Sequence, residues 1–279
     1  MSKSVVVTGV STGIGYATAK LLAEKGFHVF GSVRKAADAE RLRGALGANF
    51  TALQFDVTDE PAVRAAADQL RFALEGEKLA GLVNNAGVAV AGPISDLPVA
   101  EFRRQLEINL VGPMLVTQAF LPLLGTDRTL KGSPGRIVNI SVPFLSPYTT
   151  SKHGLEGFSE SLRRELMPFG IDVIMVAPGH VATPIWDKAE EMDIGPYEHL
   201  ETAPAMKAFR EFFIAEGKKG FPPERIAAVI HEALTAPKPK VRYPVVPGHF
   251  QNWTMPRLLP SRVVDKVLAG RFGLIPKND

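Results

Sequence analysis

The strongest constraint on the fold is the stretch from residue 5 to residue 15, which reads VVVTGVSTGIG. Three consecutive valines without polar alternation predict a strand that is buried on both faces, as in the centre of a parallel sheet. Gly9, Gly13 and Gly15 then predict a tight turn into a helix over residues 14–25, whose first N–H groups would face a bound diphosphate. The alternative is a tight strand-to-helix connection that binds no ligand.

The composition limits the classes of protein. With 279 residues, of which 46% are apolar, the chain is expected to form a single domain over 1–279 with a sizeable core. The absence of cysteine excludes disulfides and thiolate metal sites, and the six histidines do not have a metal-ligand spacing, so no metal is expected. The scattered net charge of +3 argues against a nucleic-acid partner.

Further apolar runs alternate with helical patterns along the chain. We expect the remaining strands at residues 27–33, 50–55, 79–83, 135–141, 171–177 and 241–246. This alternation predicts an α/β fold: a doubly wound (Rossmann) seven-stranded parallel sheet with helices on both faces, in three α/β/α layers. A proline in the last run places that strand at an edge.

The end of the second predicted strand bears on the choice of cofactor. In a doubly wound fold this position faces the adenine ribose, where a carboxylate would bind the 2′-hydroxyl and exclude a 2′-phosphate. This sequence has Arg34 and Lys35 there and no carboxylate. We therefore expect NADP(H) to be preferred over NAD(H), with Arg34 as the bidentate phosphate contact. The alternative is two solvated charges at the start of a helix.

A tyrosine and a lysine follow the fifth predicted strand. Tyr148 and Lys152 are four residues apart at the start of a long predicted helix, so they share one helix face. A neighbouring ammonium favours the phenolate and would lower the pKa of the phenol. Tyr148 is then a candidate acid and base for a carbonyl or alcohol oxygen while hydride moves to or from a nicotinamide.

These motifs together resemble the short-chain dehydrogenase/reductase family. The resemblance rests on the glycine turn, on Asn84-Asn85-Ala86-Gly87 after the fourth predicted strand, and on Tyr148 with Lys152. It covers residues 4 to about 184. The catalytic residues that it implies are Asn109, Ser141, Tyr148 and Lys152, with Asn109 anchoring a water of the proton relay. The implied cofactor contacts are Gly9, Ser11, Thr12, Gly13, Ile14, Gly15, Arg34, Asp56, Val57, Asn85, Ala86, Gly87, Tyr148, Lys152, Pro178, Gly179, Val181 and Thr183.

The chain departs from the family pattern before Tyr148. The family's catalytic serine stands about a dozen residues before the tyrosine, whereas Ser141 precedes Tyr148 by seven, so the loop over residues 142–147 is short. Seven extended residues span about 24 Å, so the two side chains can still converge. Ser141 is the preferred donor to the substrate oxygen, and Ser146 is the poorer alternative.

The last third of the chain has a looser pattern. Residues 185–221 resemble the family's substrate lid, and their aromatic and methionine side chains suit either a pocket wall or ordinary packing. A C-terminal extension over 247–279 is apolar and basic in turn. We expect it to cap the substrate pocket, to pack on a partner subunit or to touch a membrane surface, in that order. The connection Pro237-Lys238-Pro239-Lys240 and the strand with Tyr243 resemble the ends of hydroxysteroid and retinol dehydrogenase-like members.

The function that these observations predict is an NADP(H)-dependent oxidoreductase. It would interconvert a secondary alcohol and a ketone or aldehyde on a lipophilic, steroid-, retinoid- or lipid-like small molecule. The alternatives are a catalytically weak NADP(H)-binding sensor and, less favoured by the glycine spacing, a sugar-nucleotide epimerase. No long apolar segment precedes the glycine turn, so we expect no signal peptide or spanning helix and a cytoplasmic location. The resemblance also implies a homodimer or homotetramer.

Overall fold

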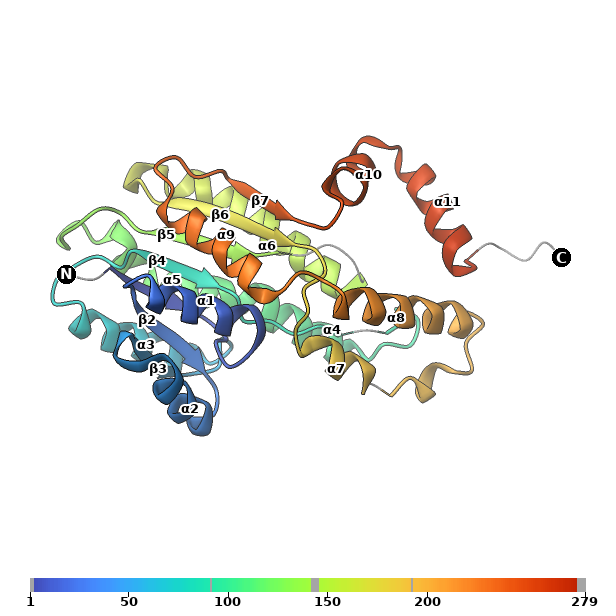
Figure 1. Cartoon of the computed structure of the whole chain (residues 1–279), viewed down its shortest axis with the longest axis horizontal. Helices are drawn as coiled ribbons and strands as arrows, with labels where there is room; N and C mark the ends of the chain where they lie inside the picture. Colours follow the sequence, from blue (N-terminus) through green and yellow to red (C-terminus); the bar gives the residue numbers. More distant parts are fainter. Residues whose placement is uncertain (1–2, 91, 142–145, 192, 275–279) are drawn as a thin grey trace.

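A parallel sheet forms the centre of the computed structural model, which describes residues 3–90, 92–141, 146–191 and 193–274. Within these residues the sheet has seven strands in the order β3-β2-β1-β4-β5-β6-β7, and every neighbouring pair is parallel (Figure 1). The strands are β1 (Ser4–Val7), β2 (His28–Val33), β3 (Phe50–Gln54), β4 (Gly81–Asn84), β5 (Arg136–Ile140), β6 (Asp172–Pro178) and β7 (Arg242–Val245).

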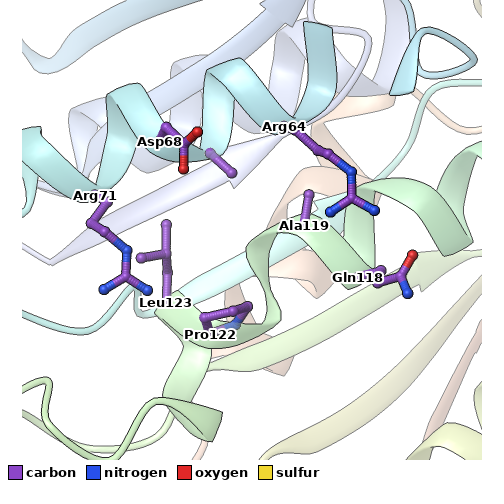
Figure 2. Close-up of a pocket in the computed structure, with 8 residues that line it drawn as sticks. Arg64, Asp68, Arg71, Gln118, Ala119, Pro122 and Leu123 are labelled. Carbon is purple, nitrogen blue, oxygen red and sulfur yellow. The ribbon is translucent and has the colours of Figure 1, made fainter. Parts of the chain in front are cut away.

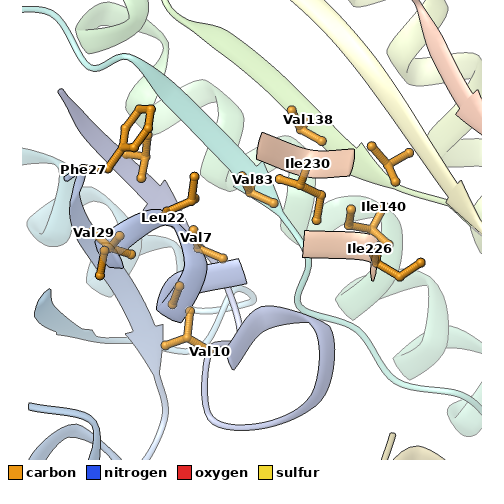
Figure 3. Packing of buried hydrophobic residues seen from close by; sticks show 14 of the residues in the cluster. Val7, Val10, Leu22, Phe27, Val29, Val83, Val138, Ile140, Ile226 and Ile230 are labelled. Atoms are coloured by element: carbon orange, nitrogen blue, oxygen red, sulfur yellow. The ribbon is translucent and has the colours of Figure 1, made fainter. Parts of the chain in front are cut away.

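Alternate residues of the strands face two separate apolar clusters, because side chains project to opposite sides of a strand in turn. Val6 is in register with Phe30 of β2 and with Leu82 of β4, and these three side chains contribute to one cluster. Val5 and Val7 contribute to the other cluster, part of which is drawn in Figure 3. All three valines of β1 are fully buried, which explains why these consecutive positions are all apolar.

Helices cover both faces of the sheet. The helices α1 (Gly13–Glu24), α2 (Ala36–Leu46) and α9 (Pro223–Thr235) contribute side chains to the cluster that contains Val5, and α1 packs along α9. The helices α3 (Glu60–Ala73), α5 (Gly112–Leu121) and α6 (Ser146–Glu165) contribute to the cluster that contains Val6. The predicted doubly wound, three-layer α/β/α architecture is thereby confirmed.

A long helical stretch runs from α4 (Val99–Leu106) into α5 through a π turn, η2 (Glu107–Val111), and ends in a second π turn, η3 (Pro122–Thr126). By length and composition this stretch is apolar enough to cross a membrane, and half of its most apolar window is buried inside the protein. Core helices of soluble proteins meet the same criteria. This stretch contributes Val116 and Phe120 to the cluster that contains Val6, so it is part of the core. The π turn η2 lies directly before the pair Gly112-Pro113.

The chain after β6 forms two additional groups of helices. The first group follows the sheet edge with α7 (Ile185–Glu190), η5 (Gly195–Tyr197) and α8 (Ala203–Lys218), in the region where the sequence predicted a lid. The second group is η6 (Phe250–Thr254), α10 (Met255–Leu258) and α11 (Ser261–Phe272). In Figure 1 α10 and α11 project from the body of the molecule on the side of β7 and α8. Two short 3-10 turns, η1 (Gly47–Asn49) and η4 (Met167–Phe169), complete the elements.

The strand boundaries lie within about two residues of those predicted. The strand predicted at an edge is β7, which is the last strand of the sheet. Residues 142–145, most of the loop that the sequence predicted to be short, lie outside the described residues.

Candidate active site

The glycine turn between β1 and α1 allows three segments of the chain to meet. Gly9 has a φ of 70°, and a Cβ on it would lie 2.9 Å from the Cα of Ala86. Gly13 has a φ of 59°, and a Cβ there would lie 3.3 Å from the Cγ2 of Thr183. A Cβ on Gly15 would overlap the carbonyl oxygen of Gly9. The glycines are therefore required for the backbone conformation and for the close approach of neighbouring segments.

Hydrogen bonds fix the Asn84-Asn85-Ala86-Gly87 segment against this turn. The Thr8 hydroxyl accepts hydrogen bonds from the backbone N–H groups of Asn85 and Ala86, both at 3.0 Å. The side-chain amide of Asn85 donates to the Thr8 carbonyl at 2.9 Å. Asn84 is buried and its amide donates to Asn139 on β5 at 2.9 Å. The amides thus stabilise the carboxyl edge of the sheet, the edge at which open parallel sheets bind ligands.

Charged residues lie at the ends of β2 and β3. Arg34 and Asp56 form an ion pair with 3.7 Å between Nη1 and Oδ2, and both side chains are partly exposed. Asp56 also accepts hydrogen bonds from the N–H and the hydroxyl of Thr58. Ser32 accepts a hydrogen bond from the Gly9 N–H at 2.9 Å, so the β2 end is joined to the glycine turn.

Arg41 is a residue of this region that the sequence analysis missed. It lies on α2, and its guanidinium donates to the Ser11 carbonyl at 2.8 Å and to Asp38 at 2.9 Å. Arg34 precedes α2, so no helical spacing relates the two arginines, and no pattern in the sequence indicated this contact. Arg41 therefore adds a second guanidinium beside the glycine turn.

Helix α6 positions Tyr148 and Lys152 at the same edge of the sheet. Lys152 is 5% exposed, and its ammonium donates to the carbonyl of Ile140, at the end of β5, at 2.8 Å. The Lys152 Nζ lies 5.7 Å from the centroid of the Tyr148 ring. One helical turn thus places the amine beside both the phenol and the strand end.

Burial dominates the electrostatics of this pair. Desolvation raises the pKa of the Tyr148 phenol and lowers the pKa of Lys152 to about 8. The sequence analysis expected the ammonium to lower the pKa of the phenol, and in this arrangement that expectation is wrong. The reason is that both groups leave water, while the ammonium is engaged by the Ile140 carbonyl.

Asn109 connects the π turn η2 to the start of α6. Its amide nitrogen donates to the Ser151 hydroxyl at 3.2 Å, and that hydroxyl donates to the Tyr148 carbonyl at 2.7 Å. Its amide group also accepts from the Val88 N–H and donates to the Val88 carbonyl, both at 2.9 Å. The fully buried Asn109 side chain therefore fixes the segment after Gly87 relative to the start of α6.

Ser141 directs its hydroxyl toward α6. The fully buried side chain donates to Oε1 of Glu156 at 3.0 Å, and the carbonyl of Lys152 lies at 3.4 Å. Oε2 of Glu156 accepts from Arg242 on β7 at 3.0 Å. Among the described residues, no hydrogen bond joins Ser141 to the Tyr148 phenol, so the role predicted for Ser141 requires its hydroxyl to rotate.

Glu156 is a second residue that the sequence analysis missed. It follows Lys152 by four residues and therefore lies on the same face of α6, which was the available signal. Its carboxylate is mostly buried between a serine and an arginine. That arrangement joins α6 to the residue after β5 and to the start of β7.

The segment after β6 closes over the glycine turn. The N–H of Gly179 donates to Val245 on β7 at 2.9 Å, and the N–H of Ala182 donates to Phe221 at 3.0 Å. Thr183 reaches Gly13. The His180 ring contacts the rings of Trp186 and Phe213 edge-on, so it packs as a loop residue, and burial lowers its pKa.

Two surface hollows lie away from the strand ends. Figure 2 shows one of about 260 Å³ between α3 and α5, and Arg64, Asp68 and Arg71 line one side of it. The other has about 480 Å³ and is lined by the start of α8, including Met206, and by residues on either side of η5, including Ile194 and Leu200. None of the predicted site residues lines either hollow. In the described part of the chain, no cluster of three or more histidine or carboxylate side chains is placed to hold a metal ion.

Comparisons with known proteins give a consistent result. A family model described as short chain dehydrogenase matches residues 3–194. The chain is 39% identical over 269 residues to the NADPH-dependent 3-dehydrocapnine reductase of Ornithobacterium rhinotracheale, with 94% of each chain covered. It is 34% identical over 285 residues to retinol dehydrogenase 5 of Mus musculus, which covers 95% of this chain and 87% of that protein.

The fold also matches a solved structure. A short-chain dehydrogenase from Streptomyces avermitilis superposes with a TM-score of 0.73 and 26% identity, with 95% of this chain and 94% of that chain covered. The likeness extends over residues beyond the family match and so includes the last third of the chain.

Proposed function

Because the chain belongs to the short-chain dehydrogenase/reductase family and is thus an NAD(P)-dependent oxidoreductase, we propose that it uses NADP(H) to interconvert a lipophilic alcohol and its ketone or aldehyde. The observation on which the proposal rests is the meeting of three segments at one edge of the sheet. These are the glycine turn, the Asn84–Gly87 segment and the start of α6.

This arrangement fits a dinucleotide. The glycine turn at the start of α1 offers backbone N–H groups without side chains in the way, and a diphosphate suits such a helix N-terminus. We assign to this region the cofactor contacts that the resemblance implied in the glycine turn, at the end of β3, after β4 and after β6. They are Gly9, Ser11, Thr12, Gly13, Ile14, Gly15, Asp56, Val57, Asn85, Ala86, Gly87, Pro178, Gly179, Val181 and Thr183. When bound, a nicotinamide cofactor accepts or supplies the hydride.

The residues of the chain move and hold the proton. Tyr148 donates a proton to the carbonyl oxygen in the reduction and accepts it from the alcohol in the oxidation. Lys152 lies within reach of the phenol ring and binds the ribose hydroxyls. Asn109 positions the start of α6 through Ser151. Ser141 donates to the substrate oxygen once its hydroxyl leaves Glu156.

Replacement of the phenol tests the assignment. In Tyr148→Phe the proton donor is lost and the ring is kept, so turnover should fall by about 10²- to 10⁴-fold. Binding of NADPH, followed by the change in its fluorescence, should stay within about twofold of the parent. Turnover at the parental rate would refute the role of Tyr148.

The preference for NADP(H) rests on Arg34 and on the absence of a carboxylate directly after β2. The name of the bacterial relative, an NADPH-dependent reductase, supports the same cofactor. Arg34 is 68% exposed in its side chain, so a 2′-phosphate can reach it, and binding would require the guanidinium to share or leave its 3.7 Å ion pair with Asp56.

Titrations with NADPH and with NADH test this preference. A charge-assisted hydrogen bond contributes about 1.5–3 kcal/mol, so Arg34→Ala should weaken NADPH binding by at least about tenfold. Binding of NADH should change little, because NADH has no 2′-phosphate. Lys35→Ala is the matched control and should have the smaller effect. Equal loss of both cofactors would show that Arg34 stabilises the site and does not select the phosphate.

The lipophilic substrate class rests on the chain after β6. We propose that residues 185–221 form a lid within one domain, and the hollow beside the start of α8 is lined by apolar side chains that include Ile194, Leu200 and Met206. The name of the mammalian relative, a retinol dehydrogenase, agrees with an apolar alcohol. A panel of ketones and aldehydes of increasing chain length, assayed with NADPH, tests this class.

A catalytically weak NADP(H)-binding sensor is the second candidate. The observation in its favour is that the Ser141 hydroxyl is engaged by Glu156 beside a shortened loop. Tight NADPH binding without turnover of any carbonyl in the panel would select the sensor.

A further inference from the structure

The last described part of the chain, residues 250–274, exposes an unusual amount of apolar surface. We call it the C-terminal segment. Most of the large apolar side chains that are exposed in the described residues belong to it: Phe250, Met255, Leu258, Leu259, Val263, Val267, Leu268 and Leu274. Leu258 and Val267 are 76% and 65% exposed. Contiguous apolar surface of this kind marks a site of interaction.

The same segment has an excess of positive charge. It contains Arg257, Arg262, Lys266 and Arg271 against the single carboxylate of Asp265. This excess equals the formal net charge of the whole chain, which is +3, so the remainder of the chain is neutral overall. The cations and the exposed apolar side chains therefore occupy the same few turns of helix.

Cations flank the exposed valines of α11. Val263 and Val267 are four residues apart and share one face, and Arg262 and Lys266 share the neighbouring face. Arg271 lies on the other side of the two valines, 4.1 Å from the centroid of the Phe212 ring. Exposed apolar side chains flanked by cations suit contact with a membrane interface.

The segment is held to the protein at its two ends. Trp253 in η6 is 9% exposed, and the Arg257 guanidinium lies 3.3 Å from the centroid of its ring. Phe272 is 8% exposed, and its ring lies 5.0 Å from that of Phe209 on α8. Between these anchors the side chains of α10 and α11 face outward, and both helices project from the body in Figure 1.

We propose that the C-terminal segment binds the surface of a membrane that contains anionic lipids. Its apolar side chains enter the boundary between headgroups and acyl chains, and its cations pair with lipid phosphates. A second copy of the chain is the less favoured occupant, because two segments with the same positive excess would repel each other. Docking would place α8 at the lipid surface. That this would bring the lid to a lipophilic substrate rests on the proposed function.

Vesicle binding of the full chain without cofactor tests the proposal. Vesicles of phosphatidylcholine alone are compared with vesicles that also contain phosphatidylglycerol, and bound protein is measured by co-sedimentation. We expect binding to the anionic vesicles that weakens as salt is raised, and much weaker binding to phosphatidylcholine. Equal binding to both vesicles, or no binding to either, would overturn the proposal.

Two pairs of variants separate the contributions of charge and apolar surface. Arg262→Glu with Lys266→Glu should weaken binding at least tenfold, since each cation contributes about fivefold near an anionic surface. The control, Lys3→Glu with Arg43→Glu, makes the same change in net charge at exposed positions of the body. Leu258→Ser with Val267→Ser should weaken binding similarly, whereas Phe72→Ser with Met167→Ser, at comparably exposed positions, should not.

Sedimentation equilibrium tests the alternative that a second copy of the chain binds the C-terminal segment. Self-association that Leu258→Ser with Val267→Ser abolishes would identify the segment as a subunit interface and overturn the membrane proposal. All these variants should retain the NADPH affinity of the parent, because no cofactor residue is changed. Vesicle binding is measured without turnover, so failure of the proposed enzymatic function would leave its outcome interpretable.

Discussion

Burial of Lys152 opposes the protonation of its amine. The side chain is 5% exposed, and desolvation lowers its pKa to about 8 from the ordinary value of 10.5. An amine with this pKa is close to half protonated in mildly alkaline solution and can exchange a proton there. A fully solvated lysine would be a fixed cation under the same conditions.

The pH dependence of stability should reveal this shift. Between pH 8 and 10 the unfolded chain keeps the proton on Lys152 while the folded protein releases it, so the free energy of unfolding rises with pH. Relative to Lys152→Met, the parent should gain about 2 kcal/mol over this interval. Urea denaturation at pH 7, 8, 9 and 10 measures the difference. A difference between the two proteins that stays constant with pH would contradict it.

Some residue contacts could be predicted from the sequence and others could not. The spacing of Tyr148 and Lys152 fixes them on one helix face, and the structure places the ammonium 5.7 Å from the ring centroid. The direction of the pKa shifts depends on how deeply the two side chains are buried. The spacing of two residues in the sequence does not predict that burial. Likewise, the Ser141 hydroxyl meets Glu156 because β5 and α6 pack together, and no local pattern contains that contact.

At the scale of elements, the strands were predictable because most of them are apolar or alternating runs that end at a glycine or a polar residue. The π turn η2 was only partly predictable. Pro113 has no N–H, so the carbonyl four residues earlier, that of Asn109, lacks its usual partner in an α-helix. The sequence therefore indicates a bend, but the tertiary contacts decide that the helix widens into a π turn.

Restoring the N–H at residue 113 tests whether this turn matters for catalysis. In Pro113→Ala the new N–H can satisfy the Asn109 carbonyl and tighten the turn, which would shift the Asn109 side chain from Ser151. We expect kcat to fall by up to about a hundredfold, as small misplacements in active sites do. KM for NADPH should change little. Pro122→Ala, at the second π turn, is the control and should leave kcat unchanged; equal effects would show a general loss of helix order.

At the scale of the whole molecule, the parallel pairing of the strands could be anticipated from the alternation of strands and helices, because parallel strands need helical crossovers. The path of the chain after β7 could not. The residues of α11 show apolar and basic character in the sequence, but whether they fold onto the body depends on the few contacts of Trp253 and Phe272. Such sparse contacts have no periodic signature.

The distribution of these contacts predicts two levels of stability. Phe120 is fully buried in the cluster between the sheet and α5, so Phe120→Ala should lower the global free energy of unfolding by about 3–5 kcal/mol. Phe272 instead packs on α8 through Phe209 and Phe212. Because these contacts lie outside the two main clusters, Phe272→Ala should lower global stability by less than about 1 kcal/mol. Urea denaturation measures both values.

Amide hydrogen exchange then locates the effect of the same substitution. In Phe272→Ala the amides of α8 and α11 should exchange faster, because their mutual contact is the one removed, while those of β1 and β4 should keep the parental rates. Phe120→Ala should accelerate exchange in the central strands as well. If Phe272→Ala destabilised the sheet as strongly as Phe120→Ala, the helices α8 and α11 would belong to the same cooperative unit as the core, and a lid that opens independently of the sheet would be excluded.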